Sequence, residues 1–420
     1  MRLLIITPYY TPDGGPSAPL FALLAEALVK RGHAVTVIAA VPHYPSGQAP
    51  DAFRKLRAVW SVEHGVKICR VPVPSVRRSN LALRLLQLLC YQVGAALAGW
   101  RQSYDIVLAS NPFFMTGLPF ATLSFFRKKA SIYAVYDVYP DVALSLGILK
   151  PGLITNLVSA LEEFCVRRAS CCRIISESFR PAVMRLGARE EKCMLVYDWV
   201  DTDLIRPLPK RSPFACQYGL ADKFVVLYAG NFGLSQGLEH VITAADLLRD
   251  QPEILFVFVG EGKAKEALVR RAGECGLTNV LFLPFQPRNR LAEVLASADL
   301  CLVMLQKGIG RCSLPSKIYS ILAGGRPILA SIDEDSDAAR LVMRAGAGLC
   351  IPPEDPTRLV EGILKIKNHP ELAVELGNHG RSHALMCHSP EAAAAQFEAL
   401  LQAALNAHGT PEAAYLEREA

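Results

Sequence analysis

The chain reads FVVLYAGNFGLSQGLEHVITAADLLR over residues 224–249, which we interpret as one complete strand, loop and helix. The apolar run 224–230 predicts a buried strand, and apolar residues at helical spacing over 236–249 predict an amphipathic helix. The connection is rich in glycine, from Gly230 to Gly237. Glycines that follow a strand let the backbone approach a ligand closely and offer N–H groups to an anion. The stretch therefore predicts a βα unit with a ligand-binding loop.

The same alternation continues on both sides of this unit. Toward the C-terminus we predict strands over 254–259, 280–285, 300–305 and 327–330, separated by helices and followed by helices alone. Toward the N-terminus we predict strands over 3–6, 35–40, 66–73, 105–110, 131–136, 172–175 and 193–197, again separated by helices. Such alternation with short connections predicts parallel sheets. The fold class is therefore α/β, with two Rossmann-like, doubly wound domains that face a cleft and end in C-terminal helices.

The domain boundary is expected where the composition changes. Residues 206–213 form a polar stretch with three prolines, which predicts a linker. We therefore expect a first domain over 1–205, a linker over 206–215 and a second domain over 216–385. The remaining helix and tail, 386–420, are candidates for packing back on the first domain.

Composition narrows the class of protein. The 420 residues are 51% hydrophobic and 20% charged, as in ordinary globular proteins. The twelve cysteines are scattered without a Cys-x-x-Cys pair, so we expect free thiols in a reducing compartment and no metal site. Residues 3–6 are too short for the apolar core of a signal peptide, and no run of about 20 residues lacks polar breaks. We therefore predict a cytoplasmic protein without a spanning helix.

The charge is divided unevenly. The first 200 residues carry 23 Lys and Arg against 13 Asp and Glu, a net charge of +10, whereas the remainder has 22 against 26, a net charge of −4. A basic first half suits the phosphates of a lipid carrier or an anionic membrane face. We find no recognition helix, zinc finger or RNA-binding motif, so no nucleic-acid partner is expected.

One helix in the first half is unusually apolar. The predicted helix 81–101 and the Phe-rich run after it are flanked by basic residues, namely Arg77, Arg78, Arg84, Arg101, Arg127, Lys128 and Lys129. Apolar surface combined with Lys and Arg favours docking on the anionic inner face of a membrane. The alternative is a core helix that is buried between layers.

Two further segments are candidate anion sites. Gly14 and Gly15 follow the first strand, where paired glycines allow close backbone approach, although a plain flexible turn has the same composition. Ser316 is a natural N-cap, with Lys317 after it and Arg311 before it. A cation is unfavourable in the first turn of a helix, so Lys317 predicts a bound negative group. The alternative is that both cations are solvated surface charges.

Taken together, the motifs of the whole chain resemble those of the retaining glycosyltransferases of family 4. The chain is most similar to the branch that builds bacterial capsule, O-antigen and colanic-acid-type exopolysaccharides. The segments that carry the resemblance are Gly14-Gly15, 31–37, 137–141, 199–201, 228–237, 259–262 and 316–327. The resemblance implies the GT-B fold, a nucleotide-diphosphate sugar donor held mainly by the second domain, an acceptor on the first domain, and no further cofactor.

The chain departs from the family pattern at the donor site. Most members carry two Glu residues there, and these positions fall at Cys312 and Ser320. The usual Arg and Lys of the second-domain glycine loop fall at Asn231 and Gln236. The leaving nucleotide diphosphate develops negative charge that cations or aimed N–H groups must stabilise. The Asp-x-Asp motifs lie at the linker and in an acidic surface run, so we invoke no metal.

The remaining cations are then the candidates for catalysis. We assign catalytic roles to Lys317 and Arg311, and to Asp137, which follows the strand 131–136 and has helix N-capping as its alternative role. We expect His43 and Tyr44 to line the acceptor pocket. The residues expected to bind the donor are Gly14, Gly15, Gly230, Asn231, Gln236, Gly237, Glu261, Phe285, Ser316 and Ser320.

The expected activity is transfer of a hexosyl or deoxyhexosyl group from a UDP- or GDP-sugar, with retention. The expected acceptor is a polyprenyl-diphosphate-linked saccharide of cell-surface polysaccharide synthesis. One alternative is a nucleotide-sugar 2-epimerase-like enzyme of the same fold. Another is a non-catalytic nucleotide-binding partner in a polysaccharide assembly complex.

Overall fold

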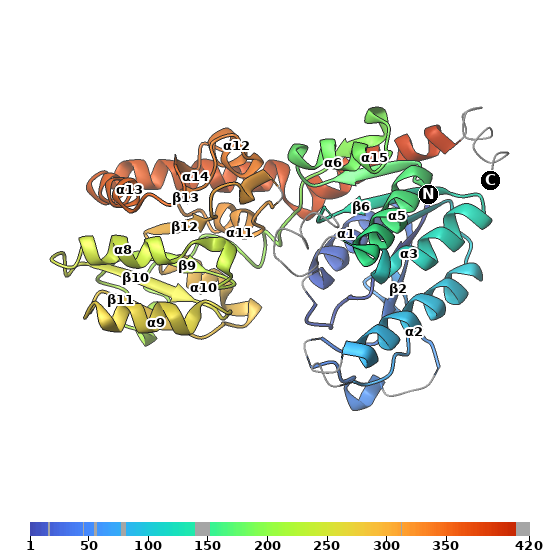
Figure 1. Cartoon of the computed structure of the whole chain (residues 1–420), viewed down its shortest axis with the longest axis horizontal. Coiled ribbons are helices and arrows are strands. Elements are labelled where there is room, and N and C mark those ends of the chain that lie inside the picture. Colours follow the sequence, from blue (N-terminus) through green and yellow to red (C-terminus); the bar gives the residue numbers. More distant parts are fainter. Residues whose placement is uncertain are drawn as a thin grey trace. The chain divides into compact units, whose positions relative to one another are not determined.

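The computed structural model describes residues 1–15, 17–44, 46–53, 57–76, 81–138, 152–311 and 313–408. The chain forms two compact units (Figure 1). The first contains Met1–Tyr197 together with the segment that begins at Pro390, and the second contains Asp198–Ser389. The predicted linker 206–215 thus lies within the second unit rather than between the two.

The first unit is built on an eight-stranded sheet with the order β3-β4-β2-β1-β5-β6-β7-β8. Neighbouring strands are parallel except for β3 and β4. The central strands are buried along their whole length, as expected of a parallel sheet with helices on both faces. The strands are β1 Arg2–Ile6, β2 Ala34–Ala40, β3 Val59–Glu63, β4 Val66–Val71, β5 Ile106–Ser110, β6 Ala130–Val135, β7 Cys171–Ile174 and β8 Cys193–Leu195.

The sequence prediction missed the edge strand β3. It pairs antiparallel with β4 through a two-residue turn at His64 and Gly65, both with positive φ. Alternating exposure along β3 marks a strand with one solvent face. The sheet is therefore mixed at one edge, and the rest of it is parallel as predicted.

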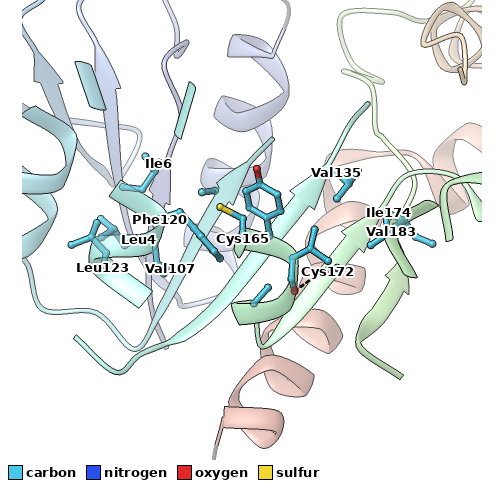
Figure 2. Close-up of a cluster of buried hydrophobic side chains, with 14 of the residues drawn as sticks. Leu4, Ile6, Val107, Phe120, Leu123, Val135, Cys165, Cys172, Ile174 and Val183 are labelled. Atoms are coloured by element: carbon cyan, nitrogen blue, oxygen red, sulfur yellow. Dashed lines mark hydrogen bonds between the residues drawn. The ribbon is translucent and has the colours of Figure 1, made fainter. Parts of the chain in front are cut away.

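Helices cover both faces of this sheet, and the core lies between them. Figure 2 shows one cluster in which Leu4, Ile6 and Val107 of the sheet lie with Phe120 and Cys165 of the covering helices. The helices of the unit are α1 Ala18–Lys30, α2 Leu81–Trp100, α3 Phe113–Ala121 with the π-turn η2 Thr122–Phe126, α5 Leu153–Arg168, α6 Arg180–Arg185 and α15 Pro390–His408.

Helix α15 joins the end of the chain to the first sheet. It packs against α1, β6 and β7 and buries Phe397, Leu400 and Leu401. Glu398 of α15 pairs with Arg31 at 2.5 Å and with His33 Nε2 at 2.9 Å, both in the turn after α1. The C-terminal helix is thus part of the first unit.

The second unit contains a six-stranded parallel sheet with the order β11-β10-β9-β12-β13-β14. The prediction missed β14, whose Gly348 lies so close to Ile328 that a Cβ would meet the Ile328 carbonyl oxygen at 2.1 Å. The strands are β9 Phe224–Ala229, β10 Ile254–Val259, β11 Val280–Leu283, β12 Leu300–Met304, β13 Ile328–Ser331 and β14 Gly348–Ile351.

The helix after β9 begins later than its apolar pattern predicts. Residues Leu234–Gln236 form a 3₁₀ turn, η5, and Gly237 adopts φ 58°, so α8 starts only at Glu239. A left-handed residue ends a helical turn, which lengthens the loop that follows β9. The helices of this unit are α7 Pro213–Gln217, α8 Glu239–Leu247, α9 Lys265–Glu274, α10 Leu291–Ala296, α11 Lys317–Ala323, α12 Asp337–Arg344, α13 Pro356–Asn368 and α14 Pro370–Cys387.

None of the described helices is both long and apolar enough to cross a bilayer. All eleven cysteines in the described ranges are free thiols.

Candidate functional site

A buried lysine forms the centre of the candidate site in the second unit. Lys317 is the first residue of α11, and its Nζ lies 3.6 Å from the centroid of the Tyr228 ring of β9. Among the described residues, this Nζ is buried and has no hydrogen-bond acceptor. Desolvation lowers the pKa of Lys317 to about 7. A buried cation is costly unless it is paired, so the arrangement is prepared for an anion.

The amine of Lys317 lies against the glycine loop that follows β9. A Cβ built on Gly230 would lie 3.1 Å from Nζ, so the absence of a side chain there leaves the amine room. The Tyr228 hydroxyl oxygen lies 2.8 Å from the Asn231 carbonyl oxygen and 3.0 Å from Gln236 Oε1, so its single proton is shared between these two acceptors. The ring of Tyr228 therefore contacts the Lys317 amine, and its hydroxyl group stabilises the conformation of the loop.

A second glycine loop packs on the first at the same edge of the sheet. A Cβ on Gly260, with φ 151°, would meet the Gly230 carbonyl oxygen at 1.9 Å. The N–H of Phe232 donates to the Glu261 carbonyl oxygen at 2.9 Å, and the Phe232 side chain is buried beneath the loops. The loops after β9 and β10 thus pack directly on each other, and only glycine fits at position 260.

The two neutral loop residues have different surroundings. Gln236 is tied to Tyr228, whereas Asn231 is exposed. The Glu261 carboxylate pairs with Lys265 at 2.6 Å, one helical turn away. Glu261 thus has a structural partner as well as the predicted place beside the loop. Within the described residues around this loop, Lys317 supplies the buried cation.

Other predicted donor-site residues are placed less centrally. Arg311 is exposed and pairs with Asp335 at 2.9 Å, so its charge is already partnered. Ser316 occupies the N-cap position of α11, but its side chain makes no capping hydrogen bond. Ser320 lies one turn after Lys317 in α11, and Phe285 is exposed beyond the end of β11. Cys312 lies outside the described residues.

In the first unit, a buried aspartate that the sequence analysis missed organises the Gly14-Gly15 loop. Asp13 accepts hydrogen bonds from the N–H groups of Gly15 at 2.7 Å, His43 at 2.7 Å and Tyr44 at 3.3 Å. Its carboxylate thereby ties the loop after β1 to the loop after β2. The His43 Nδ1 lies 2.8 Å from the Val41 carbonyl oxygen, which fixes the ring. An aspartate just before two glycines was the available signal.

Asp137 is held by a second residue that the sequence analysis missed. The Asn111 side chain donates to the Asp137 carbonyl oxygen and accepts from the Tyr136 N–H at 2.8 Å. Asn111 follows β5 and Asp137 follows β6, which are paired neighbours. The predicted catalytic Asp137 is exposed at the carboxyl edge of the first sheet, on the same edge as Asp13. Asp141, the other aspartate of the segment 137–141, lies outside the described residues.

No group of three or more His, Cys, Asp or Glu side chains suited to a metal ion occurs in the part of the chain that the structure describes. The acidic run illustrates why. Asp333 accepts from the N–H of Gly308 at 2.8 Å, and Asp337 pairs with Arg340. These carboxylates stabilise turns and helix ends.

Comparison with known proteins agrees with this arrangement. The family "Glycosyl transferases group 1" matches residues 217–383, and the "Glycosyl transferase 4-like domain" matches residues 17–199. The 4-like domain match lies almost wholly within the first unit, and the group 1 match lies within the second unit and includes its glycine loops. Both descriptions name glycosyl transferases.

Relatives match over most of their length. The chain is 28% identical over 374 residues to WcaI of Escherichia coli (strain K12), assigned to colanic acid biosynthesis as a glycosyl transferase, with 86% of this chain and 91% of the relative covered. It is 23% identical over 390 residues to the O-antigen chain mannosyltransferase C of Escherichia coli, with 91% and 92% covered.

Solved structures share the fold. Sucrose-phosphate synthase from Thermosynechococcus elongatus superposes with a TM-score of 0.71 at 18% identity, covering 96% of this chain and 98% of that one. Anabaena HepE in complex with UDP-glucose superposes with a TM-score of 0.67 at 17% identity, covering 96% and 99%. On the family matches, and with two Rossmann-like units of the GT-B fold, the chain belongs to the group 1 glycosyltransferases, the retaining family 4.

Proposed function

We propose that the protein transfers a hexosyl or deoxyhexosyl group, with retention, from a UDP- or GDP-sugar to a polyprenyl-diphosphate-linked saccharide in cell-surface polysaccharide synthesis. The single observation that carries the donor half of this proposal is the buried amine of Lys317, which lies beside the glycine loop after β9 and has no hydrogen-bond partner among the described residues. Relatives named for colanic acid and O-antigen synthesis support the pathway class, and UDP-glucose in HepE supports the donor class.

The diphosphate of the donor is the anion that fits this amine. Charge-assisted hydrogen bonds to phosphate oxygens would replace the solvation that Lys317 lost on burial. The exposed ring of Phe285 and the Gly260-Glu261 turn follow the neighbouring strands and are candidates for contacts with the nucleoside.

The same amine would act during the reaction. The bond between the anomeric carbon and the diphosphate oxygen breaks, and negative charge grows on the leaving UDP or GDP. A fixed cation in a desolvated site stabilises that charge. The departing phosphate accepts the proton of the attacking acceptor hydroxyl, and the new glycosidic bond forms on the same face of the sugar. No carboxylate base is needed for this sequence.

The acceptor half of the proposal concerns the first unit. The loops held by Asp13 and Asn111 lie at the carboxyl edge of that sheet, where the Asp137 side chain is exposed. We assign this edge to the acceptor saccharide, with Asp137 orienting its hydroxyl groups.

Titration calorimetry with UDP and GDP tests the donor site. Binding charges an amine whose pKa is about 7 in the free protein, so at pH 8 we expect uptake of up to about one proton, measured as a dependence of the binding enthalpy on the buffer. Lys317→Met should weaken binding about 10- to 100-fold and abolish the uptake. Lys307→Met, which changes an exposed lysine in the same unit, is the control.

Release of UDP or GDP upon mixing of donor and lipid-linked acceptor tests the transfer itself. Unchanged nucleotide binding and proton uptake in Lys317→Met would overturn the assignment of the donor site. Binding of nucleotide without release in the presence of polyprenyl-diphosphate-linked saccharides would overturn the acceptor class.

A further inference from the structure

The first unit has an exposed apolar stripe along α2. Leu86, Leu89, Val93, Leu97 and Trp100 recur every three or four residues and are all exposed. The opposite side of the helix packs Tyr91 and Ala95 into the core. A surface helix normally carries polar residues on its outer side, so an apolar outer side indicates something that covers it.

The stripe continues on the neighbouring helix. Helix α3 packs beside α2, as Figure 1 shows, and it exposes Phe114 and Leu118, with Phe126 farther along in η2. Phe114 and Leu118 are four residues apart and lie on one side of α3, and Phe126 is exposed in the π-turn that continues this helix. We call the two stripes together, Leu86 to Trp100 of α2 and Phe114 to Phe126 of α3 and η2, the apolar face.

The charged residues of the segment that forms this face are almost all basic. Between residues 81 and 129 the chain carries Arg84, Arg101, Arg127, Lys128 and Lys129 and a single acidic residue, Asp105. Asp105 is neutralised by Arg2 at 2.6 Å. Arg127 lies 5.5 Å from the Trp100 ring and donates to the Trp100 carbonyl oxygen at 2.5 Å, which fixes the indole at the end of α2. Tryptophan and basic residues at the rim of apolar surface are typical of a bilayer interface.

We infer that the apolar face docks on the surface of an anionic phospholipid bilayer, with α2 and α3 lying in the plane of the membrane. The charge favours this occupant over a second copy of the chain, because a dimer through this face would bring two sets of basic residues together. Helix α2, like the other described helices, is not long and apolar enough to span a membrane.

The geometry connects this face to the acceptor edge, a step that rests on the proposed function. Helix α3 begins at Phe113, directly after Asn111 and Pro112, and the Asn111 side chain holds the backbone of Asp137. Phe114 of the apolar face therefore lies one helical turn or less from the residues that position Asp137. A saccharide whose polyprenyl chain stays in the bilayer would reach this edge without leaving the membrane surface.

Co-sedimentation with lipid vesicles tests the docking. We expect the protein to pellet with vesicles of phosphatidylcholine and phosphatidylglycerol at low salt, and to remain soluble with phosphatidylcholine alone or at high salt. The triple variant Arg84→Gln, Arg101→Gln, Lys128→Gln should lower the partition coefficient about a hundredfold, since each basic residue near the surface contributes about a factor of five. The control Arg270→Gln, Lys307→Gln, Arg344→Gln removes equal charge from exposed positions of the second unit.

The apolar contribution has its own matched pair of variants. Leu89→Gln, Val93→Gln and Leu97→Gln replace side chains that are 43–63% exposed, so folding should be preserved, and vesicle binding should fall at least about tenfold. Leu247→Gln, Val269→Gln and Met343→Gln replace side chains that are 45–61% exposed in the second unit and should leave binding unchanged. Thermal melts followed by circular dichroism confirm that each variant is folded.

Three results would overturn the inference. They are no pelleting with anionic vesicles, equal loss of binding in a variant and its control, and self-association in sedimentation equilibrium that the α2 variant abolishes while vesicle binding stays absent. Nucleotide titration of the same preparations separates the two proposals. Retained UDP or GDP binding without docking would refute the membrane surface alone, whereas docking without nucleotide binding would refute the donor site.

Discussion

The buried amine of Lys317 lowers the stability of the ligand-free protein while it provides a site for an anion. Its amine is buried against Tyr228 without an acceptor among the described residues, and burial lowers its pKa to about 7 from an ordinary value of 10.5. The unfolded chain therefore binds more protons than the folded protein between these two values. The free energy of unfolding should rise with pH across this window.

The variant Lys317→Met tests this conflict between stability and binding. We expect it to raise the free energy of unfolding of the ligand-free protein at pH 7 by roughly 1–3 kcal/mol, because an apolar side chain of similar length replaces a desolvated amine. The gain should shrink as the pH rises toward 10. Denaturant titrations at several pH values measure it, and a variant that is less stable than the parent at pH 7 would contradict the assignment.

Asp13 acts through hydrogen bonds to three backbone N–H groups. Asp13→Asn places an amide N–H₂ among three backbone N–H donors, so at least one bond is lost. We expect the KM for the acceptor to rise about tenfold or more, with the nucleotide affinity of the second unit unchanged. Steady-state kinetics and titration calorimetry measure the two quantities. Asp222→Asn, which changes an exposed ion-paired carboxylate, is the control.

At the scale of elements, the periodic pattern predicted the buried strands and failed at edges and short turns. The strand β3 is half exposed, so its apolar residues do not form a run. The late start of α8 depends on the left-handed Gly237, which interrupts a pattern that is otherwise helical. Asp13 and Asn111 act through backbone groups of distant loops, and such contacts leave no periodic signal. The glycine loops and Lys317 were predictable because each lies next to its strand or helix end in the sequence.

Helix α15 provides a prediction about pH. The Arg31 guanidinium and then His33 hold the pKa of Glu398 at about 2, below its usual 4.5. A carboxylate with a lowered pKa stabilises the folded state above about pH 4.5, and this contribution is lost as the pH falls toward 2. Glu398→Gln should therefore lower the free energy of unfolding by about 0.5–1 kcal/mol at pH 7 and have little effect near pH 2. Acid titrations of stability measure this, and Glu375→Gln, which changes an exposed carboxylate on α14, is the control.

At the scale of the whole molecule, each unit has a core of its own. One core is built around β1, β5 and β6 and the other around β9, β10 and β12. The chain enters the second unit at Asp198 and returns to the first at Pro390, so the first unit is completed only by the last helix. A ligand that binds only one unit should therefore stabilise that unit without stabilising the other.

Differential scanning calorimetry with UDP or GDP tests this separation. We expect two transitions, of which one shifts upward by roughly 5 °C at about a hundredfold excess of nucleotide over its Kd, since binding then contributes about 2.7 kcal/mol. Leu401→Ala removes a fully buried side chain of α15 and should lower the free energy of unfolding of the first unit by roughly 2–5 kcal/mol. The temperature of the other transition should fall accordingly. Lys317→Met should abolish the nucleotide shift and leave the transition of the first unit in place. A single transition that both the nucleotide and Leu401→Ala displace would show that the two cores unfold together. The prediction that each unit is stabilised separately would then be wrong.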